Sequence, residues 1–223
     1  MDMNAFTNHS KAWQFVEDFE YSREPDGVRE VRALAQLNEL PQSSAAQGNL
    51  LNMLVRMLHA DSVIVVGTGA LVETAQLVEG LENHGKITVV DSSADGIRVI
   101  REFIADLADR SQTTMRAVNA DAGTFLQRLN PDDYDLIVVS GEPANYAGTF
   151  RQAASLLHRG GAIVFTDALA LDNADSSGGL TNAADRSPKA VALRELIEAV
   201  QEDDQFVSSL TPTGTGLLIA VKR

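Results

Sequence analysis

Small and acidic residues follow the short apolar runs of this sequence. Gly67-Thr68-Gly69 comes directly after SVIVV, and Asp91 comes directly after KITVV. Glycines behind a strand let the backbone approach a ligand closely, and an acid behind the next strand can accept the ribose hydroxyls. Either feature alone is also explained by an ordinary tight turn or a surface acid. Together, each at a strand end, they predict a nucleoside-containing cofactor.

The glycine turn also bears on the kind of cofactor. The dinucleotide fingerprint G-x-G-x-x-G would need glycine at position 72, where this sequence has Val72. Pyrophosphate binding depends on that close approach to a helix N-terminus. S-adenosylmethionine has no phosphate and carries a sulfonium cation, so it tolerates a looser loop in acidic surroundings. The sequence therefore favours S-adenosylmethionine over NAD.

Further candidate side chains follow three other apolar runs. Asp121 comes after TMRAV, Ser140 after YDLIVV and Asp167 after AIVFT. Ligands of open α/β sheets bind outside the carboxyl ends of the strands, so these residues belong to the same predicted site. Asp167 is the carboxylate we expect to act as general base for a hydroxyl acceptor. The alternative is a structural acid that bonds the neighbouring loop.

The elements that must position these residues alternate in type along the chain. Apolar strands and amphipathic helices alternate between residues 62 and 166. The last helix is ended by Gly160-Gly161, and the strand AIVFT follows at 162–166. This alternation indicates a parallel sheet with helices on both faces. QFVSSL and LLIAVKR are separated only by TPTGTG, and so short a turn requires antiparallel pairing. We therefore predict a Rossmann-like α/β fold whose seven-stranded, mostly parallel sheet ends in an antiparallel hairpin.

Residues 1–40 have helical periodicity and an apolar stripe. Trp13, Phe15, Val16 and Phe19 share one face of the first expected helix. An isolated helix cannot leave such a face in water, so the sheet domain or a second subunit must cover it.

Composition excludes several classes of function. The 223 residues include 18 basic and 31 acidic side chains, a net charge of −13 that would repel nucleic acids and anionic membranes. The lack of cysteine removes disulfides, thiolate metal sites and cysteine nucleophiles. There is no leader-like N-terminus and no apolar run of membrane-spanning length. We expect a cytoplasmic protein that binds neither nucleic acid nor membrane.

The motifs and their order resemble the O-methyltransferase family that includes catechol and caffeoyl-CoA O-methyltransferases. The resemblance covers roughly residues 40–223 and rests on PQSSAAQGNLLNML, VIVVGTG, NADA, YDLIVVSGEPANY, RGGAIVFTDA and GTGLLIAVK. It implies a class I methyltransferase fold that uses S-adenosylmethionine, with a helical segment at 1–40 and the methyltransferase domain at 41–223. It also implies a small-molecule acceptor and a homodimer.

By position, the resemblance implies a set of cofactor contacts. Asp121 and Ala122 would lie at the adenine end and Asp91 at the ribose. The expected cofactor-binding set is Ser43, Gly67, Thr68, Gly69, Asp91, Asp121, Ala122 and Ser140. Two of these residues have structural alternatives, because Ser43 or Asp121 could simply cap the helix that follows it.

The sequence departs from the family pattern where metal-dependent members hold a divalent cation. Ser140 and Ala168 replace an aspartate and an asparagine among the ligands, and only Asp167 remains. One carboxylate cannot hold magnesium in competition with water. Pro143 replaces the basic residue that assists the acceptor hydroxyl. We therefore expect no metal site.

The glycine-turn region departs as well. Val65 stands at the usual acid, Leu71 at the third glycine and Glu73 at a usual serine. Glu73 would repel the methionine carboxylate unless it points away or pairs with a cation. These replacements keep two hypotheses open, a metal-independent O-methyltransferase and a non-catalytic homologue that binds a nucleoside ligand or a partner.

Overall fold

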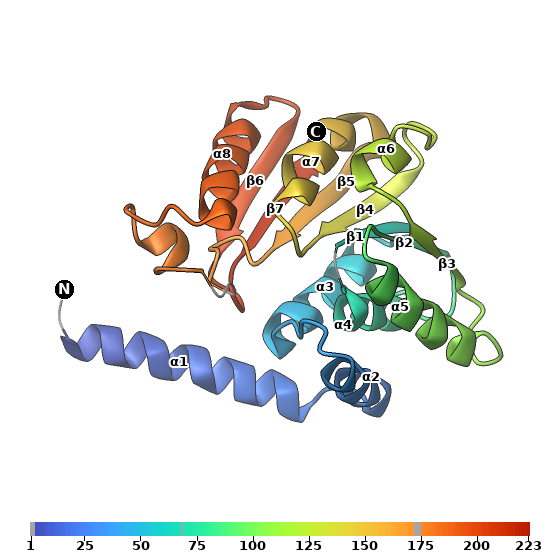
Figure 1. The fold of residues 1–223 in the computed structure, drawn as a ribbon, viewed down its shortest axis with the longest axis horizontal. Coiled ribbons are helices and arrows are strands. Elements are labelled where there is room, and N and C mark those ends of the chain that lie inside the picture. Colours follow the sequence, from blue (N-terminus) through green and yellow to red (C-terminus); the bar gives the residue numbers. More distant parts are fainter. Residues whose placement is uncertain (1–2, 68, 172–174) are drawn as a thin grey trace.

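The computed structural model describes residues 3–67, 69–171 and 175–223, with side chains from Ser10 onward. In this part of the chain, seven strands form one sheet in the order β3-β2-β1-β4-β5-β7-β6 (Figure 1). Strands β1 to β5 are parallel, whereas β7 pairs antiparallel with both β5 and β6. The predicted fold, with its antiparallel C-terminal hairpin, is confirmed.

The elements alternate along the chain as the apolar pattern predicts. The strands are β1 (Ser62–Val66), β2 (Lys86–Asp91), β3 (Thr114–Asn119), β4 (Tyr134–Val139), β5 (Leu157–Thr166), β6 (Phe206–Thr211) and β7 (Leu217–Lys222). The helices are α1 (Met3–Ser22), α2 (Asp26–Leu37), α3 (Ala45–Met57), α4 (Leu71–Gly80), α5 (Ala94–Leu107), α6 (Ala122–Leu126), α7 (Ala144–Leu156) and α8 (Pro188–Glu202), with a short 3-10 helix at Gly179–Thr181.

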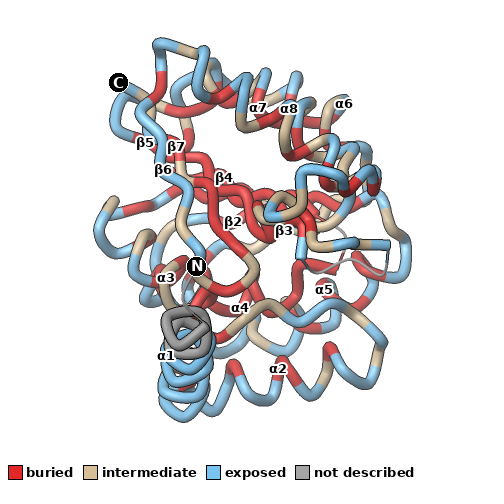
Figure 2. The backbone as a smooth tube through the Cα atoms, turned by 90° about the vertical axis from the view of Figure 1, so that its left-hand side faces the viewer, coloured by how far each residue is buried: buried red, intermediate tan, exposed pale blue. Residues whose placement is uncertain are grey.

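Two hydrophobic cores lie on opposite faces of the sheet. In β1, Val63 and Val65 pack with residues of α2 to α5, whereas Ile64 and Val66 pack with residues of α6 to α8. These four side chains are buried, and the central strands form the buried interior in Figure 2. A strand buried on both faces carries a nearly continuous apolar run, which is why the four residues after Ser62 in SVIVV are recognisable as a strand.

Strand β5 begins earlier than the sequence predicts. Leu157 pairs with Tyr134, but the next pair is Ala162 with Leu136, so the register shifts between them. Gly160 has a φ of +87°, a conformation that glycine adopts at no steric cost. The two glycines therefore form an irregularity inside β5. The expectation that they end the preceding helix and that the strand begins only after them is wrong.

Helix α1 presents its apolar face to solvent. Phe15 and Phe19 are 69% and 46% exposed. The opposite face meets the body of the molecule through Glu17, whose carboxylate accepts the N–H of Ala45 at the start of α3 over 2.6 Å. Figure 2 shows α1 as a largely exposed helix beside α3. Trp13 of the predicted stripe donates its indole N–H to the Gly214 carbonyl over 3.0 Å, but it is still 50% exposed. The sheet domain therefore leaves most of the predicted apolar stripe uncovered.

Candidate functional site

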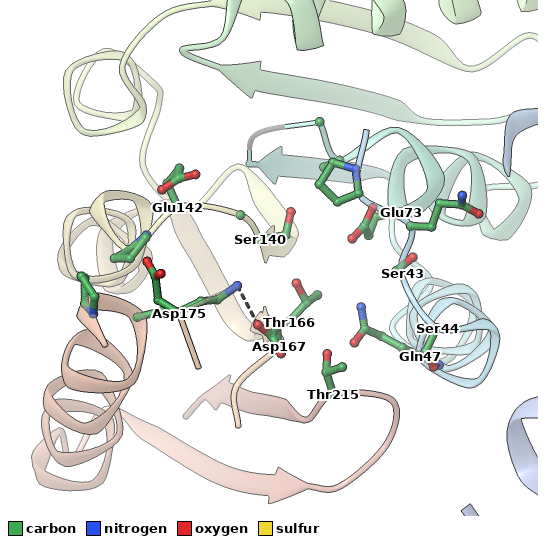
Figure 3. A pocket seen from close by; sticks show the side chains of 18 residues that line it. Ser43, Ser44, Gln47, Glu73, Ser140, Glu142, Thr166, Asp167, Asp175 and Thr215 are labelled. Carbon is green, nitrogen blue, oxygen red and sulfur yellow. Dashed lines mark hydrogen bonds and ion pairs between the residues drawn. The ribbon is translucent and has the colours of Figure 1, made fainter. Parts of the chain in front are cut away.

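A cleft of about 320 Å³ opens where β1, β4 and β5 end (Figure 3). The chain leaves β1 toward β2 and β3 on one side and returns to β4 on the other, so the cleft lies at the topological switch point. Its lining comes from the segment before and into α3, the turn after β1 with the start of α4, the segments after β4 and β5, the start of α8 and the turn between β6 and β7: Pro41, Gln42, Ser43, Ser44, Gln47, Gly69, Ala70, Glu73, Ser140, Gly141, Glu142, Pro143, Thr166, Asp167, Asp175, Pro188, Lys189 and Thr215.

The ends of β1 and β4 approach each other too closely for a side chain at position 67. A Cβ on Gly67 would lie 2.3 Å from the Ser140 Oγ and 2.7 Å from its carbonyl oxygen. The Ser140 N–H donates to the Val66 carbonyl over 2.8 Å, which fixes the two strand ends side by side. Glycine at 67 is therefore a requirement of the backbone. Thr68, also expected at the cofactor, lies outside the described residues.

The Asp91 carboxylate stabilises the glycine turn after β1 by hydrogen bonding. One carboxylate oxygen accepts the N–H of Gly69 over 2.9 Å, and the other accepts the N–H of Ser93 over 2.7 Å. Burial raises the pKa of the Asp91 carboxyl, and these two hydrogen bonds act in the opposite direction. The side chain is buried under the turn and does not line the cleft. Each carboxylate oxygen has two lone pairs, so each keeps one position for a further donor.

The approach to α3 brings Ser43 into the cleft lining. The N-cap of α3 is Ser44, whose Oγ accepts the N–H of Gln47 over 3.1 Å. The alternative that Ser43 caps this helix is therefore wrong. The Ser43 Oγ is buried and has no hydrogen-bond partner among the described residues. A buried hydroxyl of this kind is a ready donor or acceptor for a ligand.

Asp121 and Ala122 lie at the start of α6. Asp121 is the N-cap of that helix, and its carboxylate accepts the N–H of Thr124 over 2.8 Å. Neither residue lines the cleft. The structure thus brings Ser43, Gly69, Ser140 and Asp167 to one cleft but does not bring Asp121 and Ala122 to it.

The end of β5 carries an ion pair. Asp167 and Lys189 have side chains only 9% and 11% exposed, and the Lys189 Nζ lies 2.6 Å from Asp167 Oδ2. Asp167 Oδ1 accepts the N–H of Leu171 over 3.1 Å. The φ of Asp167 is +49°, a left-handed conformation that is uncommon outside glycine. The neighbouring Ala168 is completely buried and offers no polar atom from its side chain.

Carboxylates dominate the charge of the cleft. Glu73, Glu142, Asp167 and Asp175 line it (Figure 3). Among the described lining residues, Lys189 is the one basic side chain. Glu73 is buried in the first turn of α4 and does not point away from the cleft. This lining favours a ligand that carries positive charge, because the carboxylates would repel a negatively charged ligand in a partly buried cleft.

Lys189 is the lining residue of greatest chemical interest that the sequence does not reveal. Ser187-Pro188 predicts the start of a helix, and Pro188 is indeed the first residue of α8. A lysine in the first turn is unfavourable beside the positive end of the helix dipole, and this is the signal that could have singled it out.

Comparison with known proteins decides the family. The sequence profile of the O-methyltransferase family matches residues 21–223. The chain belongs to this family. A curated protein of Mycobacterium sp. (strain JLS), provisionally named an O-methyltransferase, is 31% identical over 177 residues, which are 79% of this chain and 77% of that protein. Because members use S-adenosylmethionine, the predicted family, enzyme class and methyl donor are confirmed, and the non-catalytic alternative is not favoured.

Solved structures agree with the fold of this O-methyltransferase. A protein from Corynebacterium glutamicum has a TM-score of 0.79 and 24% identity, with 95% of this chain and 97% of that chain covered. An O-methyltransferase from Bacillus cereus, in complex with S-adenosylhomocysteine, has a TM-score of 0.75 and 18% identity over 96% and 99% of the two chains. No helix in the described ranges is long and apolar enough to cross a membrane.

Proposed function

We propose that this O-methyltransferase transfers the methyl group of S-adenosylmethionine to an oxygen of a small acceptor, without a divalent metal ion. The observation that carries the proposal is the cleft at the end of β1, β4 and β5, which is lined both by the glycine turn and by Asp167, the carboxylate at the end of β5. The net charge of −13 supports a small acceptor over a nucleic acid. We place the enzyme in the cytoplasm, where the methyl donor is made.

We assign the donor to the β1 side of the cleft. Asp91 would accept the ribose hydroxyls through the lone pairs that Gly69 and Ser93 leave available. Glu73 lies where the ammonium of the methionine part can pair with a carboxylate, and the buried Ser43 hydroxyl can reach the same part. The expected set is completed by Gly67, Thr68, Gly69, Asp121, Ala122 and Ser140.

The chain's own contribution to the reaction is orientation and charge. S-adenosylmethionine supplies a methyl group on a positively charged sulfur. Holding an acceptor oxygen in line with that methyl group can provide several kcal/mol of the barrier reduction. Asp167, at the floor of the cleft, would accept the proton of the acceptor hydroxyl and pass it to water.

A transfer assay with the full chain tests this function. A panel of small phenols and enols is incubated with S-adenosylmethionine and a chelator, and methyl ether and S-adenosylhomocysteine are measured by mass spectrometry. We expect turnover of at least one acceptor, reduced about 10²-fold or more in Asp167→Asn. Turnover that requires added magnesium, or turnover that Asp167→Asn leaves unchanged, would contradict the proposal.

We also propose that two copies of the chain pair through α1. Phe15 and Phe19 stack with their ring centroids 6.2 Å apart while both remain largely exposed. Glu17 fixes the helix to the start of α3, so this apolar face cannot turn inward without breaking that contact. A two-fold dimer would bury the same patch of both copies against itself.

Sedimentation of the full chain tests the dimer. We expect a dimer at tens of micromolar, a monomer for Phe15→Ser with Phe19→Ser, and no change for Leu37→Ser, which removes a still more exposed apolar side chain from α2. A monomeric wild type would refute the dimer. A dimer that persists in the double variant would move the contact to the sheet domain.

A further inference from the structure

The β5 side of the cleft, opposite the side that we assign to the donor, is where we place the acceptor. It contains a buried cation whose position needs an explanation. Lys189 belongs to the first turn of α8, where the helix dipole disfavours positive charge, and no acidic residue of that turn compensates it. Its ammonium instead reaches Asp167, 2.6 Å away at the end of β5. Buried ion pairs are seldom more stable than apolar pairs of the same size. Stability alone therefore does not account for a lysine at this place.

The same place is where the family resemblance puts a divalent cation in metal-dependent members. A hard cation needs several oxygen ligands, preferably anionic. Of the three ligand positions, Ser140 is a hydroxyl, Ala168 is a buried methyl group, and Asp167 already faces an ammonium. Within the described residues, no three His, Asp or Glu side chains gather as a metal site. The residues present do not fit a divalent metal ion.

We propose that the Lys189 ammonium is the cation of the acceptor site and binds the reacting oxygen directly. The proposal rests on the proposed methyl transfer and names its acceptor class, a phenol or enol with one acidic hydroxyl. A divalent ion is chelated by two vicinal oxygens, whereas an ammonium donates separate hydrogen bonds and needs only one oxygen. Lys189 also lines the cleft, so its ammonium can contact Asp167 and an acceptor at once.

The step that follows is balanced by the residues named. The acceptor hydroxyl gives its proton to Asp167, which passes it to water, while the ammonium stabilises the oxyanion. The acceptor oxygen then bonds the methyl carbon as the carbon–sulfur bond breaks, and that electron pair stays on sulfur. The products are a methyl ether and a thioether. An oriented charge on a mostly buried side chain is an effective way to stabilise a reacting oxygen.

A purely structural ion pair would only tie α8 to β5, and a chromophoric probe separates the two roles. 4-Nitrophenol absorbs differently in its neutral and ionised forms. It is titrated into the full chain saturated with S-adenosylhomocysteine, in chelator, at a pH below the pKa of the free probe. We expect the wild type to bind the ionised form. We expect Lys189→Met to bind the probe at least tenfold more weakly and without ionising it, and Lys189→Arg to keep part of the effect.

Matched controls distinguish the outcomes. Lys222→Met removes another lysine of an ion pair, with Asp132 at 3.0 Å outside the cleft, and should bind the probe like the wild type. 4-Nitrocatechol, which has vicinal hydroxyls, should bind the wild type no more than a few-fold more tightly than 4-nitrophenol does. Each variant is also checked for its melting temperature and for S-adenosylhomocysteine binding by calorimetry. Lys189→Met should lower the melting temperature, because it removes one partner of a buried ion pair, whereas S-adenosylhomocysteine binding should stay near its wild-type value in every variant.

The inference is overturned if the wild type binds the probe only in its neutral form or not at all, or if Lys189→Met still binds the ionised form. It is also overturned if 4-nitrocatechol is preferred tenfold and chelation abolishes that preference. Absence of S-adenosylhomocysteine binding to the wild type would instead overturn the proposed function itself.

Discussion

The two sides of the cleft are built in different ways. On the β1 side, the backbone sets the geometry: a Cβ on Gly67 would collide with Ser140, and Asp91 is bonded to the N–H of Gly69. On the β5 side, side chains set the geometry, and Lys189 arrives from a helix distant in sequence. In our assignment, the β1 side binds the donor and tolerates few changes. The β5 side binds the acceptor, and there the Lys189 ammonium takes the place that a divalent cation has in metal-dependent members.

The largest effect should come from Asp91. Asp91→Ala removes a carboxylate that holds the glycine turn and, in our assignment, accepts two ribose hydroxyls. Hydrogen bonds to a charged group contribute roughly 1.5–3 kcal/mol each, so S-adenosylhomocysteine should bind about tenfold or more weakly by calorimetry. Asp95→Ala, which removes an exposed acid from the first turn of α5, is the matched control. An unchanged dissociation constant in Asp91→Ala would place the ribose elsewhere.

Substitution of Glu73 should change the affinity for S-adenosylhomocysteine by about one order of magnitude. The direction of the change decides whether Glu73 attracts or repels the amino-acid part of the donor. If the carboxylate pairs with the donor's ammonium, Glu73→Gln should weaken S-adenosylhomocysteine binding by about tenfold. The same variant should bind 5′-methylthioadenosine, which has no amino-acid part, as the wild type does. Tighter binding of S-adenosylhomocysteine to Glu73→Gln would show instead that Glu73 repels the donor carboxylate.

A smaller effect is expected from Asp185, which orders the loop that leads into α8. Its carboxylate accepts the N–H of Ser187, and also those of Ser177 and Gly179, and these bonds hold the pKa of Asp185 below its usual range. A carboxyl whose pKa is lowered by folding stabilises the fold at any pH above its pKa in the unfolded chain, which is about 3.9. This contribution is lost as the pH falls from there through the lower pKa of the folded state. Asp185→Asn should therefore lower the Tm at neutral pH, and the difference in Tm between wild type and variant should become smaller in acid. A Tm difference that is constant with pH would show that the ionised Asp185 carboxylate does not stabilise the loop.

The smallest expected effect is that of metal removal. Chelator should leave both S-adenosylhomocysteine binding and methyl transfer unchanged, because Ser140 and Ala168 replace ligands and Lys189 faces the remaining carboxylate. The assay compares rates with chelator, with magnesium, and with neither. A rate that is lost on chelation and restored by magnesium would remove the distinction between the two sides of the cleft.

The strands and their order could be predicted from the sequence because burial on both faces demands apolar runs. The start of β5 could not, since Gly160 adopts a positive φ inside the strand and resembles a stop. The apolar stripe of α1 was evident as well. Its outward orientation was not, because it depends on Glu17 bonding the start of α3, a contact between distant parts of the chain.

The candidate site divides in the same way. The positions of Gly67, Asp91, Ser140 and Asp167 follow from the rule that ligands bind at the carboxyl ends of parallel strands. Whether Asp121 and Ala122 contact the donor stays a prediction, as does the boundary at residue 40. The place of Lys189 in the cleft could not be predicted: a lysine in the first turn of a helix is locally unusual, but no local pattern shows that the start of α8 folds over the end of β5.

The central claim is that this cleft binds the methyl donor, and calorimetry of the full-length wild type with S-adenosylhomocysteine tests it most directly. We predict saturable binding at one site per chain, unchanged by chelator and weakened in Asp91→Ala. The absence of binding heat for both S-adenosylhomocysteine and S-adenosylmethionine, over a range of temperatures, would contradict the account.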